Sequence, residues 1–177
     1  MAVVPILTVP NPLLEQKCKK VEKVDEETKQ LVQNLLDTLR DAKDPEGAGL
    51  AAPQVGVLKR VCIVRKFLPN PDPNSTRPYT TQEQVLINPK IISADKETTL
   101  DYEGCLSIPN TYGKVLRAKK LKIKALDELG NKIRIKANDE YARIIQHEMD
   151  HLDGILFTTK LVGETLTEKE LDKLYEK

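Results

Sequence analysis

The sequence predicts a single α+β domain over residues 1–177, with a mixed, largely antiparallel sheet around a central helix and a further helix near each end. The chain is long enough for one domain with a substantial core. Apolar and polar residues alternate between positions 121 and 137, which is typical of strands with one buried face. Leucines recur at helical spacing between 31 and 39, and capping residues mark helix starts near 139 and 167.

The first part of the chain combines irregular backbone, a helix and a glycine-rich run. Three prolines break residues 1–24, so this segment is expected to be irregular or extended. Asp25 can cap a helix whose leucine stripe faces the core and fades at 41–45. Glycines in the run 47–54 allow close backbone approach, but the run lacks the ending of a phosphate loop. Taken alone, the run 47–54 is equally consistent with an ordinary turn that leads into a strand.

Short extended segments are expected through the middle of the chain. The apolar, β-branched run Lys59 to Val64 predicts a strand. Four prolines in 67–81 predict an exposed loop. Two short extended pieces, 85–88 and 91–92, flank a proline, and Thr98 to Tyr102 predicts another strand.

A hairpin and two helices complete the predicted fold. Residues 121–125 and 133–137 alternate around a glycine-containing turn. Their lysines resemble a basic patch, but the alternation favours a solvated strand face over a nucleic-acid site. Asn138 or Asp139 can cap the central helix, with Gly154 suited to its end. A capping box of Thr167 and Glu170 predicts the last helix.

Composition narrows the classes of function. Lys plus Arg number 28 and Asp plus Glu number 27, so no global charge draws the chain to DNA or to an anionic membrane. Seven aromatic residues and no tryptophan argue against stacking of single-stranded bases. The three cysteines are widely spaced, and the N-terminus resembles neither a signal nor a transit peptide. We therefore expect a cytoplasmic protein without a disulfide framework.

The only two histidines, His147 and His151, lie four positions apart with Glu148 between them. On a helix, residues four apart share a face, so both imidazoles can reach one metal ion. Glu148 lies beside them and can act on a water bound to that metal. The alternative is two ordinary histidines on a solvated helix face, which the specific spacing disfavours.

A catalytic metal site usually has three protein ligands and one open position. No histidine follows His151, which argues against a metallopeptidase of the usual kind. Cys105 can supply a thiolate from upstream. The alternative is that Cys105 is a buried structural cysteine, and composition alone does not distinguish it from Cys62. A Cys-His-His set by itself suggests zinc first.

Three motifs together resemble those of the peptide deformylases. They are Gly47 to Gln54 (GAGLAAPQ), Glu103 to Ser107 (EGCLS) and Gln146 to Leu152 (QHEMDHL), in that family's order and with plausible spacing. The N-terminal stretch and the hairpin are also similar to the family, in its compact bacterial form. The resemblance therefore covers nearly the whole chain.

The resemblance implies a role for each motif residue. Cys105, His147 and His151 would bind one Fe²⁺ ion, with Zn²⁺, Ni²⁺ or Co²⁺ as substitutes. A water or hydroxide in the fourth position would be the nucleophile, and Glu148 would serve as general base and then general acid. The Gln54 amide and the Leu106 backbone N–H would stabilise the oxyanion.

The implied substrate is the N-formyl-methionyl end of a nascent polypeptide, and the implied products are formate and a free amino terminus. An extended peptide would lie along the backbone as an added strand. The residues expected to bind it are Gly47, Ala48, Gly49, Leu50, Glu103 and Gly104. A transient ribosome contact is also implied, but the tail 168–177 is no obvious RNA-binding element.

Some features depart from the family's pattern. Ala48 stands where relatives often carry a larger aliphatic residue, Glu140 and Arg143 stand where some carry apolar pocket residues, and the loop 67–81 looks long. Arg117 is expected to pair with Asp150 and support the ligand helix.

Two rival functions are considered. One is a general metallopeptidase, and the other is a non-catalytic metal-binding or peptide-binding protein.

Overall fold

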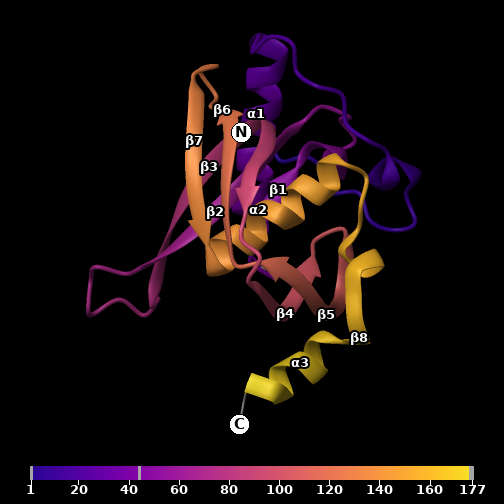
Figure 1. The fold of residues 1–177 in the computed structure, drawn as a ribbon, viewed down its shortest axis with the longest axis vertical. Coiled ribbons are helices and arrows are strands. Elements are labelled where there is room, and N and C mark those ends of the chain that lie inside the picture. Colours follow the sequence, from indigo (N-terminus) through magenta and orange to yellow (C-terminus); the bar gives the residue numbers. More distant parts are fainter. Residues whose placement is uncertain (1, 44, 176–177) are drawn as a thin grey trace.

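The computed structural model describes residues 2–43 and 45–175, which form three α-helices and eight strands (Figure 1). The helices are α1 (Glu26–Asp41), α2 (Asp139–Leu152) and α3 (Glu168–Tyr175). The strands are β1 (Gly49–Ala51), β2 (Val61–Pro69), β3 (Tyr79–Ala94), β4 (Thr98–Cys105), β5 (Ile108–Ala118), β6 (Lys120–Leu126), β7 (Lys132–Asn138) and β8 (Leu161–Leu166). Short 3-10 turns occupy Pro12–Glu15, Ala52–Val55 and Phe157–Lys160. Among the described residues, each helix is too short or too polar to span a lipid bilayer.

The strands divide between two sheets. One sheet has the order β1-β2-β3-β6-β7 and the other β4-β5-β8. The predicted α+β class and the antiparallel sheet are confirmed, and every pairing between the named strands is antiparallel. The sequence did not indicate the division into two sheets, because strand order depends on contacts between distant segments. Helix α2 packs on the larger sheet and also contacts β5 (Figure 1).

Helix α2 is the central helix that the sequence predicts. One side of it carries Ala142, Ile145, Met149 and Leu152, which pack on the inward side chains of β2, β3, β6 and β7. Burial of this stripe stabilises the helix far more than its intrinsic propensity does. Asn138 occupies the N-cap position, but its side chain makes no capping hydrogen bond. The helix ends before Gly154, whose φ of 72° fits the predicted left-handed turn.

Helix α1 covers part of the opposite side of the larger sheet. The Asp25 carboxylate accepts a hydrogen bond from the Thr28 N–H at 2.9 Å, as a helix N-cap does. The leucines of α1 pack against Leu50, Ile63 and Ile87 of the sheet. The predicted helix, its cap and its buried stripe are therefore confirmed.

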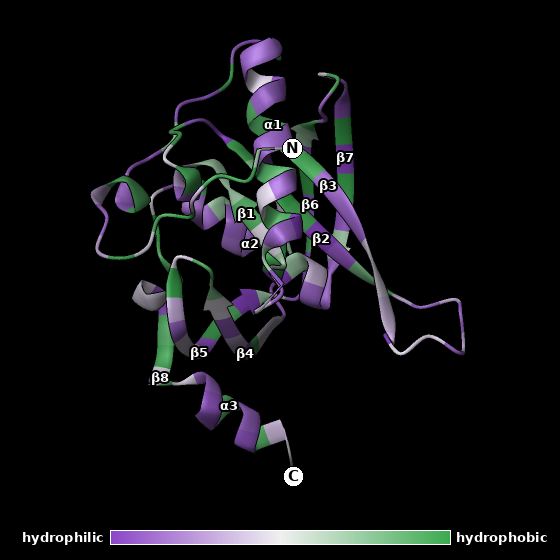
Figure 2. Cartoon of the chain, turned by 180° about the vertical axis from the view of Figure 1, so that it is seen from behind, coloured by the Kyte–Doolittle hydropathy of each residue, from purple (hydrophilic) through white to green (hydrophobic). Residues whose placement is uncertain are grey.

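Tertiary pairing lengthens the strands beyond the sequence prediction. The expected loop 67–81 is shorter, because Phe67 pairs with Thr81 and Pro69 with Tyr79. The remaining segment, 70–78, projects from the body of the molecule (Figures 1 and 2). The two extended pieces at 85–88 and 91–92 belong to one strand, β3, with two register shifts at its pairing with β6. Strand β8 has mostly exposed residues, so the sequence did not show it.

The close packing of Gly154, in the turn after α2, can be tested by substitution with alanine. A Cβ atom at Gly154 would lie 2.5 Å from the Glu15 carbonyl oxygen, whereas one at Gly163 would meet nothing within 4 Å. Both residues have positive φ, so alanine at either costs roughly 1–2 kcal/mol. We expect Gly154→Ala to cost about 1–3 kcal/mol more, since the backbone must move. Equal losses in chemical denaturation would contradict this packing.

Candidate metal centre and active-site cavity

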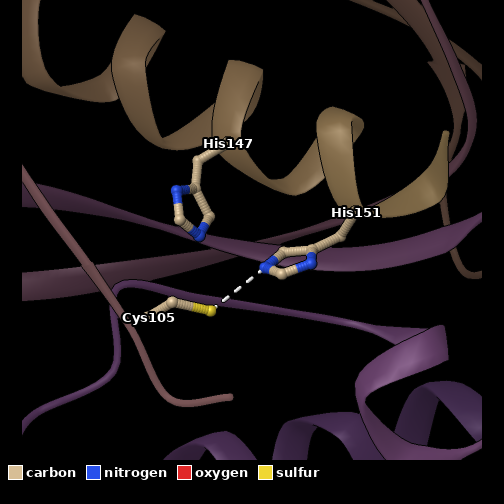
Figure 3. A group of neighbouring side chains, drawn as sticks. All are labelled: Cys105, His147 and His151. Atoms are coloured by element: carbon tan, nitrogen blue, oxygen red, sulfur yellow. Dashed lines mark hydrogen bonds between the residues drawn. The ribbon is translucent and has the colours of Figure 1, made fainter. Parts of the chain in front are cut away.

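The three predicted metal ligands meet at one point of the fold. His147 and His151 project from the same side of α2, and Cys105 faces them from the end of β4 (Figure 3). The Cys105 Sγ lies 3.2 Å from the His151 Nε2. One nitrogen of each imidazole and the sulfur all lie within 4.8 Å of one another. The three atoms can therefore face a single ion.

The donor set suits a divalent transition metal. A thiolate and two imidazole nitrogens favour borderline and soft ions over calcium or magnesium. Three protein ligands also leave a position for water or substrate, as in catalytic sites. The buried Nδ1 of His151 has no hydrogen-bond partner among the described residues.

The three cysteines occupy different environments. Cys18 and Cys62 are buried in the apolar core, and burial raises the pKa of the Cys62 thiol well above its ordinary value. Cys105 is only partly buried and lines a cavity. The structure thereby separates the candidate ligand from Cys62, which the sequence alone did not do.

A buried carboxylate, Glu103, orients the first histidine. Its Oε2 lies 2.9 Å from the His147 Nδ1, which leaves the Nε2 of that ring free for a metal. Arg117 donates two hydrogen bonds to the same carboxylate, at 2.8 and 2.9 Å, and Arg143 donates a third at 2.8 Å. Carboxylate partners of this kind fix the tautomer and orientation of metal-binding histidines.

The charges around Glu103 decide its protonation. Burial alone would raise its pKa, but hydrogen bonds from Arg117 and His147 outweigh burial and hold the pKa well below the ordinary value. Glu103 therefore remains a carboxylate. Its oxygens are engaged by three side chains of the protein, and the residue also lines the cavity described below.

Arg117 and Arg143 connect this carboxylate to the rest of the fold. Arg117 also donates to Asp150 at 2.5 Å, which confirms the predicted pair. Arg143 is buried and donates to the backbone carbonyls of Val115 and Thr99. It lines the cavity but is not a free charge there, since Glu103 pairs with it.

The Gln54 side chain is fixed next to the thiol. Its Oε1 accepts a hydrogen bond from the Ala51 N–H at 2.8 Å, so the amide nitrogen must point the other way. That nitrogen lies 3.1 Å from the Ser107 Oγ and 3.6 Å from the Cys105 Sγ. Leu106 lies in the turn between Cys105 and Ser107 and lines the same cavity.

The N-terminal segment holds both sides of this arrangement. The Leu7 N–H donates to the Gln54 carbonyl at 2.7 Å, and the Val9 N–H donates to the Ser107 carbonyl at 3.0 Å. An irregular segment far away in sequence thus ties the glycine-rich run to the cysteine motif.

Glu148 is buried and lines the cavity beside the histidines. Its Oε2 has no hydrogen-bond partner among the described residues. Burial raises the pKa of Glu148 to about 7, against the opposing effect of His147. Gly49 makes room for this side chain, because a Cβ atom there would lie 2.5 Å from the Glu148 Oε1.

The cavity has a volume of about 310 Å³. The predicted site residues that line it are Gly47, Ala48, Gly49, Gln54, Glu103, Gly104, Cys105, Leu106, His147 and Glu148. Glu140 and Arg143, which the sequence marked as departures, line it as well. Leu50 is not among the lining residues, because its side chain is fully buried against α1. Alternation along β1 turns its side chain to the other side of the sheet.

Comparison with known proteins decides the family. A family model described as polypeptide deformylase matches residues 3–166. The chain belongs to this family. A peptide deformylase of Thermomicrobium roseum is 43% identical over 164 residues, which cover 91% of this chain and 87% of that protein. Family membership and the ligand cluster make the chain a metal-dependent hydrolase, and the family removes N-formyl groups from nascent peptides.

Solved structures agree with this assignment. A peptide deformylase from Ehrlichia chaffeensis superposes with a TM-score of 0.81 at 34% identity, covering 99% of this chain and 94% of that one. A class I type b peptide deformylase from Acinetobacter baumannii, bound to Met-Ala-Ser, superposes with a TM-score of 0.79 at 34% identity. Its match covers 90% of this chain and 99% of that one.

Two supporting contacts escaped the sequence analysis. One is the pairing of Glu103 with His147 and two arginines, and the other is the hydrogen bond from Gln54 to Ser107. An arginine at 143 amid the apolar run of α2 was a signal of a buried partner, since a charge there must be paired.

The Glu103 contacts predict the behaviour of Glu103→Gln. The two buried arginines would lose their counter-charge, so we expect a loss of about 3–5 kcal/mol in the free energy of unfolding. Metal affinity should fall about 10–100-fold, because the amide orients His147 less firmly. Chelator competition and denaturant titration measure the two effects.

Glu97→Gln is the matched control. Glu97 pairs with Lys119 at the surface, so stability and metal affinity should stay near those of the wild type. Unchanged metal affinity in Glu103→Gln would contradict the orienting role.

Proposed function

We propose that this chain hydrolyses the N-formyl group of the N-terminal formylmethionine of nascent polypeptides and releases formate. The observation that carries the proposal is the shared cavity of Glu148, Gln54 and the ligand atoms of Cys105 and His147. A carboxylate for proton transfer, an amide donor and a metal site are the groups that amide hydrolysis requires. The family assignment supplies the substrate class.

Cys105, His147 and His151 would hold one Fe²⁺ ion, with Zn²⁺, Ni²⁺ or Co²⁺ as possible replacements. The ion would polarise the formyl carbonyl and make a water molecule nucleophilic at neutral pH. The donor set supports a transition metal in general, and the choice of iron rests on the family resemblance.

The proposed roles of the protein groups follow from their positions. Glu148 accepts the proton that the attacking water loses and returns it to the departing amine nitrogen. The Gln54 amide and the Leu106 N–H donate to the formyl oxygen as it gains charge, a contribution of roughly 3 kcal/mol for each donor in comparable enzymes. Glu103 holds the His147 ring through its carboxylate.

The substrate peptide would lie in an extended conformation against β1 and the end of β4. Gly49 and Gly104 present backbone at this edge without a Cβ atom, which suits pairing with an added strand. The Acinetobacter baumannii relative bound to Met-Ala-Ser supports a short peptide as ligand. Ala48 and Glu140 line the same cavity and would shape the selectivity for the side chains of the substrate. Action on nascent chains implies a transient contact with the ribosome.

Formate release from formyl-Met-Ala by anaerobically prepared, iron-loaded protein tests this function. We expect turnover by the wild type and no cleavage of unformylated peptides. Bound metal without formate release would instead favour a binding protein, and cleavage of internal peptide bonds would favour a general peptidase.

Glu148→Ala tests the proton transfer separately. This variant should keep its metal, because Glu148 is not a ligand, and lose a factor of about 10²–10⁴ in turnover. Glu148→Gln, which preserves the volume of the side chain, should lose a similar factor. Elemental analysis verifies the metal, and wild-type turnover in either variant would refute the role.

A further inference from the structure

Seven cations form one exposed surface on the larger sheet, here called the cationic face. They are Lys90, Lys120, Lys122, Lys124, Lys132, Arg134 and Lys136, and all are exposed. They lie on β3, β6 and β7, where residues 88–94, 120–126 and 132–138 contain no acidic residue. The alternation that the sequence showed therefore yields a surface of one sign of charge.

The strand register places like charges directly opposite one another. Lys122 pairs with Lys136, Lys124 with Arg134, and Lys90 with Lys124. Cross-strand neighbours lie roughly 5 Å apart, and like charges at such positions destabilise a sheet. A face that only kept the sheet soluble would gain stability from alternating signs. The alternation in the sequence favoured a solvated face, but the pairing of like charges across the strands is visible only in the structure.

Neighbouring acids do not neutralise the cationic face. Glu26 and Glu27, at the start of α1, pair with Lys29 and Lys59. Acids at the ends of the hairpin, Asp95, Asp127, Glu128 and Asp139, lie outside these strand segments. The whole chain has 28 lysines and arginines and 27 acidic residues. Without the seven cations of this face, the other residues carry 21 cations and 27 acids. The near-neutral total conceals a strong local charge.

The cationic face points away from the catalytic cavity. The inward residues of β6 and β7, such as Leu121 and Ile123, pack against α2, which carries the metal ligands. The outward residue Leu126 packs with the cluster that includes the α1 leucines, so α1 covers only the adjoining part of this side. A partner on the cationic face would leave the cavity open to a peptide.

We propose that the cationic face binds the phosphate backbone of double-stranded RNA without reading its sequence. The cations lie about 5 Å apart across strands and roughly 6.6 Å apart along a strand. These rows of positive charge would lie against the closely spaced phosphates of a duplex. The face carries no aromatic side chain, which excludes base stacking as its mode of binding. Strands β6 and β7 belong to a five-stranded sheet and are not a free two-stranded ribbon that could enter a DNA major groove, whereas the wide, shallow minor groove of RNA suits a broad surface.

Fluorescence anisotropy with a labelled RNA duplex of about 20 base pairs tests the proposal on the full-length, metal-loaded protein. Binding should weaken steeply as salt rises from 50 to 200 mM. The triple variant Lys122→Gln, Lys124→Gln, Lys136→Gln should bind at least tenfold more weakly at 50 mM salt. Its salt-dependence slope should fall by about 2–3, since up to three phosphate contacts are lost.

The control variant Lys114→Gln, Lys169→Gln, Lys173→Gln loses the same charge elsewhere and should bind within twofold of the wild type. Both variants should release formate at the wild-type rate. Removal of like-charge pairs should leave the first variant at least as stable as the wild type in low salt. Lys122→Arg, Lys124→Arg, Lys136→Arg keeps the charge and should keep binding.

Three results would overturn the proposal. The first is no RNA binding at 50 mM salt, and the second is equal loss of binding in both glutamine variants. The third is stronger binding to a DNA duplex of the same length, or to vesicles containing phosphatidylserine, than to RNA. Exposed Ile92 beside the face, at 50% exposure, makes the vesicle arm a necessary comparison.

Discussion

The structure depends on one buried carboxylate, that of Glu103. It lies between Arg117, Arg143 and His147, which come from β5 and α2, while Glu103 itself lies on β4. The same contacts therefore dock the smaller sheet on the central helix and orient His147, one of the three residues that could hold a metal ion. Removing a single partner leaves a buried charge uncompensated, so structure and site fail together. This coupling explains why Cys105, two residues after Glu103, reaches the histidines of α2.

The sequence predicted what local patterns encode. The helical spacing of His147 and His151, the leucine stripe of α1 and the alternation of β6 and β7 each depend on nearby residues, and each is confirmed. The three motifs identified the family, and the family model and the relatives confirm it. Residue chemistry made Cys105 a candidate ligand, but only the resemblance assigned it to the ligand set, because no local pattern can bring residue 105 to residue 147.

What the sequence did not predict depends on packing between distant segments. The partners of Glu103 lie 14 to 44 positions away in the sequence, so no periodic pattern predicts these contacts. The alternation of β1 directs the Leu50 side chain to the α1 side, where it is fully buried, and the sequence did not show this burial. Strand β8 carries too few buried residues to show an alternating pattern. The lysines of the hairpin were visible, but their like-charge register requires the paired strands.

We propose that Cys105, His147 and His151 form one ligand set for a single ion. X-ray absorption at the iron edge of anaerobically loaded protein tests it most directly. The wild type should show one sulfur and two imidazole nitrogens around the iron, and Cys105→Ser should show no sulfur, since Cys18 and Cys62 are buried in the core. A wild-type spectrum without sulfur, or a sulfur signal that survives in Cys105→Ser, would contradict it.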